Sequence, residues 1–159
     1  MGGSDNWCTS RTFLDPLEKF NCGPPAMDPC SNPASVVNAA IELYGPKLNG
    51  CGLALPWVTT GLVFVNPPYS DLFTWMARCA EAAALGSEVV ALIPAYTDTA
   101  WFHQFAVPAG VRLFWEGRLS FLDPKGRTRF PARFPSLACY WGRRIKRFRR
   151  TMGPYGYLT

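Results

Sequence analysis

Four consecutive residues, Asn66-Pro67-Pro68-Tyr69, combine an amide, a stiff turn and an aromatic ring directly after an apolar run. Proline fixes φ and has no backbone N–H, so two prolines in a row present carbonyl oxygens and almost no donors. The side-chain oxygen of Asn66 is a further acceptor, and the ring of Tyr69 can stack on a flat heterocycle. Two acceptors suit the two N–H bonds of a planar NH₂ group. An amino group held in this way loses conjugation with its ring and becomes a better nucleophile, so the stretch predicts chemistry at an amino or amide nitrogen.

The elements around this stretch predict where it lies. Residues 62–66 form an apolar run typical of a strand buried on both faces, and residues 70–86 have the period of an amphipathic helix. Strands alternating with helices predict an α/β fold with a mostly parallel sheet covered by helices on both faces. Further strands are predicted at 88–93, 111–115, 118–121 and 136–141, and further helices at 34–45, 99–105 and 143–152.

Between its strand and its helix, the stretch resembles the D/N/S-P-P-Y/F/W motif of amino-methyltransferases that use S-adenosylmethionine (SAM). Over nearly its full length the chain is similar to the phage-type DNA N6-adenine methyltransferases. This resemblance implies a Rossmann-like SAM-dependent methyltransferase fold, SAM as cofactor, and a DNA adenine flipped out of the duplex for methylation at N6. The similar segments are DNWCTS (5–10), MDPCS (27–31), GLALPW (52–57), FVNPPYS (64–70), LIPAYTDTAWFH (92–103), GRLSF (117–121) and FPSL (134–137).

The resemblance also implies roles at the catalytic turn. Asn66 and Pro67 would hold the adenine N6 amino group, with Pro68 keeping the turn rigid, and Tyr69 would stack on the base. Asn66 would border the cofactor as well. The family pattern includes Asp98, Trp101 and His103, to which we assign no chemistry.

A second set of residues would bind the cofactor. Asp28, Pro29 and Cys30 correspond to a motif after the first strand, where an acid usually lies close to the methionine amino group. Thr9 corresponds to an element that binds the tail of the cofactor, and Glu42 is a candidate for the acid that binds its ribose.

Two features depart from the family pattern. Thr9 is followed by serine where proline is usual, and the stretch DPCSNPAS (28–35) has no glycine where a glycine-rich cofactor loop is expected. A non-catalytic DNA-binding protein on a degenerate methyltransferase scaffold therefore stays open. Enzymes that methylate cytosine N4, RNA adenine or a protein glutamine also fit an Asn-Pro-Pro-Tyr turn.

Charge is divided unevenly along the chain. Residues 112–150 hold twelve Lys/Arg and two acids, whereas the whole chain has a net charge of +5. A basic C-terminal third predicts a polyanionic partner, here DNA. The predicted helix at 143–152 would turn Ile145, Phe148 and Met152 inward, and its basic tract RRIKRFRR (143–150) would contact phosphates. The candidate DNA contacts are Tyr69, Arg118, Arg147, Arg149 and Arg150.

Other classes of protein are disfavoured. The chain has six cysteines with no C-x-x-C pair and a single histidine, which predicts no metal site. No apolar run approaches the 18 residues of a membrane span, and the N-terminus lacks the order of a signal peptide. We expect one compact domain over residues 1–159, with no membrane partner, in the cytoplasm of a bacterial or phage-infected host cell.

Overall fold

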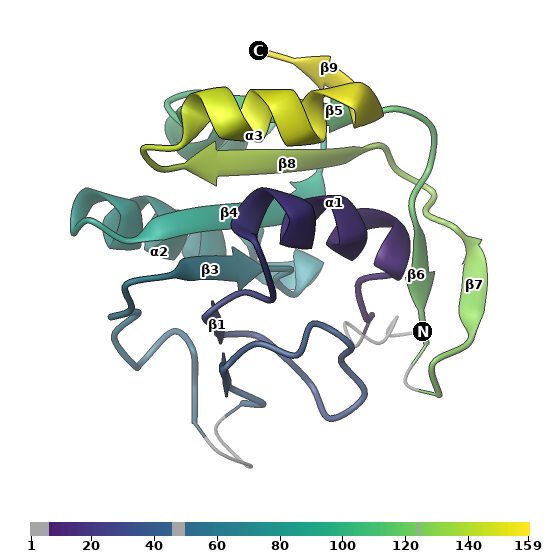
Figure 1. The fold of residues 1–159 in the computed structure, drawn as a ribbon, viewed down its shortest axis with the longest axis horizontal. Helices are drawn as coiled ribbons and strands as arrows, with labels where there is room; N and C mark the ends of the chain where they lie inside the picture. The colour runs from purple at the N-terminus through teal and green to yellow at the C-terminus, as the bar shows by residue number, and fades with distance from the viewer. Residues whose placement is uncertain (1–6, 46–49, 124) are drawn as a thin grey trace.

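In the computed structural model of the chain, residues 7–45, 50–123 and 125–159 are described. Seven strands form one sheet in the order β2-β1-β3-β4-β8-β5-β9, and β6 and β7 pair as a separate hairpin (Figure 1). The strands are β1 (Met27–Asp28), β2 (Ile41–Glu42), β3 (Leu62–Val65), β4 (Glu88–Pro94), β5 (Val111–Trp115), β6 (Ser120–Leu122), β7 (Thr128–Pro131), β8 (Ser136–Trp141) and β9 (Gly156–Leu158). The helices are α1 (Arg11–Asn21), α2 (Leu72–Ala84) and α3 (Ile145–Met152), with short helical turns η1 (Tyr69–Asp71), η2 (Phe102–Ala106) and η3 (Gly153–Tyr155).

The sheet is parallel in one half and antiparallel in the other. Strands β2, β1, β3 and β4 pair in parallel, whereas β8 runs antiparallel to both β4 and β5, and β9 runs antiparallel to β5. The α/β class is therefore confirmed, but "mostly parallel" describes only the first half of the sheet. The change of strand direction at β8 agrees with the connection between β5 and β8, which contains the β6–β7 hairpin and, among its described residues, no helix. Parallel neighbours usually need a helical crossover, whereas antiparallel neighbours do not.

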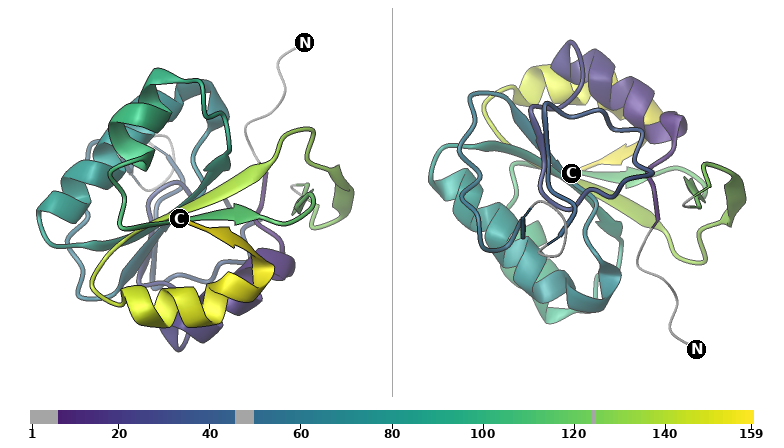
Figure 2. Two further views of the ribbon diagram at one scale, coloured as in Figure 1. Left: turned by 90° about the horizontal axis from the view of Figure 1, so that it is seen from above. Right: turned by 90° about the horizontal axis from the view of Figure 1, so that it is seen from below.

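Strands β1 to β5 run in the same direction and end on the same side of the sheet, which we call its carboxyl end. The opposite side is its amino end. Helices cover both faces, as predicted. Helices α1 and α3 lie on one face, and α2 and η2 lie on the other (Figure 2). Alternation along β3 serves both layers, since Leu62 and Phe64 join the core under α1 and α3, and Val63 and Val65 join the core under α2.

The helix predicted at 70–86 and the strands predicted at 62–66 and 88–93 are confirmed. Helix α2 stops before Gly86, whose φ of 100° lies in the left-handed region that glycine adopts without strain. The basic helix α3 is also present, with Phe148 and Met152 buried, but the prediction for Ile145 is wrong because its side chain is 37% exposed.

The helix predicted at 34–45 is wrong. Residues 34–40 are irregular and lead into β2. The Asn32 side chain accepts a hydrogen bond from the Ala34 N–H at 2.9 Å, and the Ser35 hydroxyl accepts one from Val37 at 3.2 Å. Such local bonds compete with the helix for the backbone donors, and the extended chain still buries Val37.

Candidate active site

The carboxyl end of the sheet brings together two predicted motifs. Asp28 ends β1, and Asn66 follows the last residue of β3. Strand β2 lies on one side of β1, and β3 lies on the other. The order of the strands therefore reverses at β1. In open α/β sheets, ligands bind outside the carboxyl ends of the strands at such a switch point.

Asn66 is the centre of a hydrogen-bonded cluster at this point. Its Nδ2 donates to Thr9 Oγ1 at 3.1 Å, and its Oδ1 accepts a hydrogen bond from the Tyr69 hydroxyl at 3.2 Å. The Cys30 thiol donates to the Asn66 backbone carbonyl at 3.2 Å. Thr9, Cys30 and Tyr69 thus all bond to Asn66. Thr9 lies 57 residues and Cys30 lies 36 residues from Asn66 in the sequence. The contacts join the predicted cofactor residues to the predicted catalytic turn.

Asp28 is buried beside this cluster. Its Oδ1 accepts a hydrogen bond from the Cys30 N–H at 3.1 Å, and it lies in register with Glu42 on β2. Burial raises the pKa of Asp28 to about 7, and the nearby Glu42 carboxylate acts in the same direction. Among the described residues no Lys or Arg forms an ion pair with Asp28. A buried acid without a cation is a site that a positively charged ligand would stabilise.

A glycine holds the loop after Asp28 in place. A Cβ at Gly52 would lie 1.9 Å from the Pro29 carbonyl oxygen, so only glycine allows this approach. The Trp57 indole donates to the Gly52 carbonyl at 2.7 Å and fixes the segment from the other side. The segment 52–57, which the sequence analysis quoted without a role, therefore supports the Asp28–Cys30 loop.

Helix α1 begins next to Thr9 and was not predicted from the sequence, because Pro16 interrupts its helical pattern. Ser10 precedes the helix, and its buried Oγ has no hydrogen-bond partner among the described residues. The first N–H groups of a helix lack internal partners and carry a partial positive charge. The start of α1 is therefore a polar place that suits a carboxylate.

An aromatic group borders the catalytic turn. The rings of Tyr69 and Phe134 meet edge to face with centroids 5.2 Å apart, and Phe134 contacts Tyr96 at 6.0 Å. Burial raises the pKa of Tyr69, which keeps its hydroxyl protonated as a donor to Asn66. The sequence analysis quoted the segments that carry Tyr96 and Phe134 but did not select these two residues, because neither is distinctive without its neighbours.

The three further residues of the family pattern do not join this cluster. Trp101 is buried in the core beneath α2, and Phe102 beside it packs edge to face on the exposed His103. Asp98 is exposed on the loop after β4.

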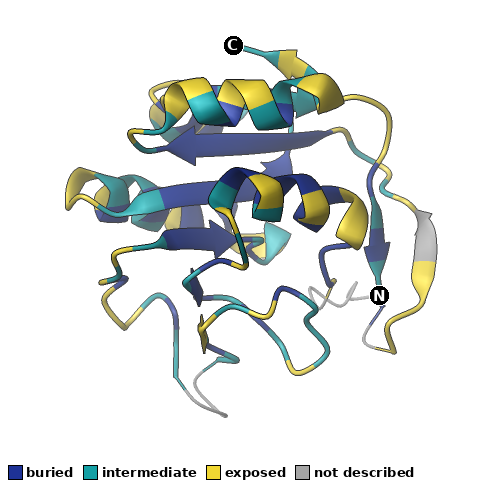
Figure 3. Cartoon of the chain, viewed as in Figure 1, coloured by how far each residue is buried: buried dark blue, intermediate teal, exposed yellow. Residues whose placement is uncertain are grey.

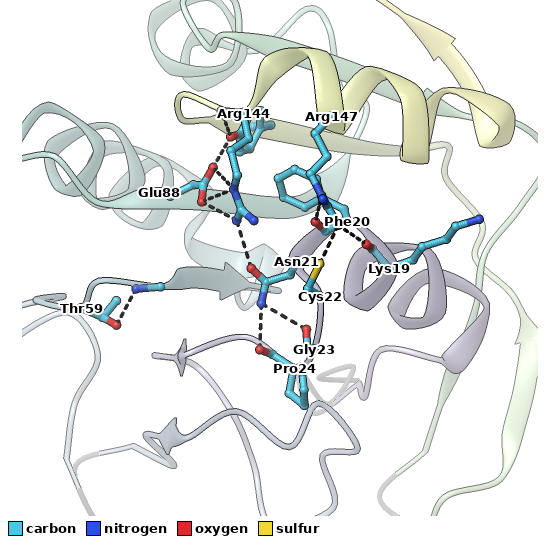
Figure 4. Close-up of polar contacts among 12 residues, drawn as sticks. Lys19, Phe20, Asn21, Cys22, Gly23, Pro24, Thr59, Glu88, Arg144 and Arg147 are labelled. Carbon is cyan, nitrogen blue, oxygen red and sulfur yellow. Dashed lines mark hydrogen bonds and ion pairs between the residues drawn. The ribbon is translucent and has the colours of Figure 1, made fainter.

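The predicted DNA-contacting arginines divide into two groups. Arg147 donates from Nε to the Phe20 carbonyl at 2.6 Å and from Nη2 to the Lys19 carbonyl at 3.1 Å, so it satisfies the last carbonyls of α1 (Figure 4). A phosphate contact by Arg147 would compete with these bonds. The exposed arginines of the set are Arg118, Arg149 and Arg150.

Arg144 belongs to the same polar network at the amino end of the sheet. It donates to both oxygens of Glu88, with Nε 2.9 Å from Oε2, and to Asn21 Oδ1 at 3.0 Å. Its guanidinium also lies 4.5 Å above the Phe20 ring. A surface cavity at this end, lined by Pro56, Trp57, Arg78 and Ser87 among others, lies across the sheet from the catalytic turn.

Other kinds of site receive no support from the described part of the chain. It contains no group of three or more His, Cys, Asp or Glu placed to hold a metal ion. No helix among the described residues has the length and apolar character needed to cross a membrane.

An α/β sheet with a buried acid and an amide-proline turn at its switch point is consistent with a methyltransferase-like fold. The family model described as DNA N-6-adenine-methyltransferase (Dam) matches residues 3–143, and the chain belongs to this family. The protein is accordingly an adenine-specific DNA methyltransferase. No curated protein and no solved structure matches the chain.

Proposed function

We propose that the carboxyl end of the sheet binds SAM across the switch point between β1 and β3, and that the turn Asn66–Tyr69 holds the adenine N6 amino group. The observation that carries this proposal is the hydrogen-bonded convergence of Thr9, Cys30 and Asn66 beside Asp28. In this proposal the fold is a Rossmann-like methyltransferase fold whose parallel half holds the cofactor.

The residues present fit SAM group by group. The buried carboxyl of Asp28 would pair with the methionine ammonium. The start of α1 would take the carboxylate, together with Thr9 and the Ser10 hydroxyl, which has no hydrogen-bond partner in the described part of the chain. Glu42, at the carboxyl end of β2, would bind the ribose hydroxyls in addition to the hydrogen bonds that it accepts from the Ala39 N–H and the Tyr44 hydroxyl. SAM would supply an electrophilic methyl group bound to a sulfonium. The loop after Asp28 has no glycine of its own, and the close approach of Gly52 to Pro29 would shape it in place of the usual glycine-rich sequence.

The catalytic turn offers two acceptors for the amino group. The side-chain amide oxygen of Asn66, Oδ1, has two lone pairs, of which the Tyr69 hydroxyl uses one. The Pro68 carbonyl accepts from the Asp71 N–H, whereas no backbone donor among the described residues takes the Pro67 carbonyl. Asn66 Oδ1 and Pro67 O would therefore receive the two N–H bonds and orient the nitrogen lone pair for attack.

The substrate in this proposal is an adenine rotated out of the DNA helix, because a stacked base cannot reach a half-buried turn. Tyr69 would stack on the base, and Arg118, Arg149 and Arg150 remain candidates for phosphate contacts. The family match supports adenine N6 in DNA over cytosine N4, RNA adenine or a protein glutamine.

The test is mass spectrometry of nucleosides from unmethylated DNA treated with the protein and SAM. We expect N6-methyladenine as the product. Asn66→Ala should lower the rate by about a hundredfold or more, because the nucleophile is no longer held in place. SAM affinity should stay within a few-fold. Asn66→Asp is the matched control, since it keeps an oxygen acceptor and should retain more activity than alanine. N4-methylcytosine as the only product, or near-normal turnover by Asn66→Ala, would contradict the proposal.

A further inference from the structure

The β6–β7 hairpin stands off the carboxyl end of the sheet, on the side where the catalytic turn lies (Figures 1 and 2). Its first strand follows the end of β5, and its second strand leads into the start of β8, so both of its connections lie at the carboxyl end. The hairpin is not part of the main sheet, and within the described residues its strands pair with each other and with the N-terminal segment at Cys8.

Both sides of the hairpin are attached to the active-site cluster. Cys8 and Leu122 exchange two backbone hydrogen bonds, of 3.0 and 2.9 Å, and Cys8 directly precedes Thr9, which bonds to Asn66. On the other side, Phe134 follows β7 and packs against Tyr69. The hairpin is thus positioned relative to the catalytic turn at two separate places.

The turn of the hairpin is internally fixed and presents positive charge. Asp123 is buried and accepts hydrogen bonds from the backbone N–H groups of Lys125 and Arg127, at 2.9 and 3.0 Å, and from the Arg127 guanidinium. The acid of the hairpin is therefore engaged within the turn. Arg118, Lys125 and Arg133 are exposed and form no ion pair among the described residues. Figure 3 shows exposed segments of chain next to both strands of the hairpin.

The dimensions also fit DNA. Strands rise about 3.3 Å per residue, so an extended chain from Arg118 to Asp123 spans about 16 Å. A two-stranded ribbon fits the major groove of B-DNA, which is about 12 Å wide. An adenine held at Asn66 would bring the adjacent duplex against this arm.

We propose that the β6–β7 hairpin is the arm that binds duplex DNA beside the flipped adenine, through phosphate contacts of Arg118, Lys125 and Arg133. This inference rests on the proposed function and adds to it the surface that receives the duplex. The first part of the basic tract is placed differently, because Arg144 and Arg147 are bonded to Glu88 and to the end of α1 at the amino end.

The test compares two double variants of equal charge. Lys125→Gln/Arg133→Gln removes two charges from the hairpin, and Lys19→Gln/Arg143→Gln removes two exposed charges near the amino end. Binding to an unmethylated duplex is followed by fluorescence anisotropy over a range of salt concentrations. Each lost phosphate contact should lower the slope of log K against log salt by about 0.9. The hairpin variant should therefore lose about 1–2 units of slope, and the control should match the wild type.

Activity on the same duplex separates this inference from the proposed function. The hairpin variant should raise KM for DNA about tenfold, the order expected for two phosphate contacts, with kcat at saturating DNA within about twofold. Failure of the wild type to form N6-methyladenine would count against the proposed function. Normal methylation together with an unchanged salt slope in the hairpin variant would overturn only the inference. If thermal melting shows that the double variant is unfolded, Lys125→Gln alone, exposed at the turn, should lose about 0.9 of slope.

Discussion

The two ends of the sheet differ in how far their buried polar groups are paired. At the amino end, Glu88 and Arg144 form an ion pair with two oxygens engaged, and Arg147 satisfies the carbonyls that end α1. At the carboxyl end, Asp28 is buried without a cation, and the hydroxyls of Ser10 and Ser136 are buried without a hydrogen-bond partner among the described residues. Among the described residues, Ser31 Oγ at the carboxyl end and Arg78 Nε at the amino end are also buried without a hydrogen-bond partner. Unsatisfied buried polar groups reduce stability, and three of the four lie on segments at the carboxyl end. The ion pair at the amino end stabilises the fold, whereas the buried, unpaired Asp28 at the carboxyl end reduces stability in the absence of a ligand.

The largest effect should come from Gly52→Ala, because the added Cβ would meet the backbone of Pro29 and no flexible side chain can move away. The Asp28–Cys30 loop should shift, and SAM affinity should fall by about a hundredfold, or roughly 2.7 kcal/mol. Calorimetric titration with SAM measures this. Gly110→Ala is the control, since its Cβ would meet only an ordinary contact at 3.4 Å. Equal SAM affinity of the two variants would show that the loop does not depend on this approach.

Asp28→Asn should separate stability from binding. The pKa of Asp28 is raised to about 7, so between about pH 4 and 7 the folded state keeps a proton that the unfolded state has lost. The stability of the wild type therefore falls as the pH rises through this window, whereas asparagine has no proton to lose. Without SAM, the unfolding free energy of the variant relative to the wild type should rise from pH 5 to pH 8 by about 2–3 kcal/mol.

With SAM the sign should reverse. Asp28→Asn should bind the cofactor at least about tenfold more weakly, or 1.4 kcal/mol, because the ammonium loses its counter-charge. Thermal melts at pH 5 and pH 8, with and without SAM, measure both effects. A variant that is less stable than the wild type at pH 8 without SAM would break the contrast between the two ends of the sheet.

Glu88→Gln tests the amino end. Arg144 would keep its place above Phe20 but lose its charged partner, and the side chains of the pair are only 34% and 20% exposed. We expect a loss of about 1–3 kcal/mol in unfolding free energy. Kinetic constants of methyl transfer should be unchanged below the melting temperature. Asp15→Asn weakens the more exposed Arg11–Asp15 pair, whose side chains are 46% and 65% exposed, and should cost less than about 0.5 kcal/mol. A comparable loss in both variants would remove the special role of the Glu88 network.

Tyr69→Phe should have the smallest effect. It removes the hydroxyl that donates to Asn66 Oδ1 but keeps the ring. One such hydrogen bond contributes about 0.5–1.5 kcal/mol, so kcat should fall about two- to tenfold. Tyr69→Ala should lose more, because base–aromatic stacking contributes roughly 1–3 kcal/mol. Tyr157→Phe, at a position 72% exposed, is the control. If Tyr69→Phe and Tyr69→Ala lose equal activity, the hydroxyl rather than the ring carries the function.

The parts that sequence predicted well are those whose signals are local. Continuous apolar runs predicted β3 and β4, and a 3.6-residue period predicted α2. The Asn-Pro-Pro-Tyr turn was correctly predicted to lie between a strand and a helix. The prediction failed where side chains compete with a helix for backbone N–H groups, because the hydrophobic pattern does not record such hydrogen bonds. Residues 34–40 have helical spacing, but the side chains of Asn32 and Ser35 take the backbone donors.

Two other features depend on neighbours far away in the sequence. Arg147 looks like a free cation in a basic tract, and only the position of α1 shows that its guanidinium bonds to the Phe20 carbonyl. The antiparallel half of the sheet depends on the β6–β7 hairpin, and residues 116–135 give no signal for the direction in which β8 returns.

The bonds around Asn66 also bear on how the protein becomes active. They join Asn66 to Thr9 and Cys30 across 57 and 36 residues, and Tyr69 meets Phe134 from the second half of the chain. Contacts of such high sequence separation form only after long loops have closed, so they raise the contact order and belong to slow steps of folding. A chain still emerging from the ribosome before Phe134 carries the complete Asn-Pro-Pro-Tyr motif without an assembled site around it. Enzymatic activity in this protein is therefore a property acquired by the folded chain as a whole, and its first appearance during synthesis reports the closure of the longest loops.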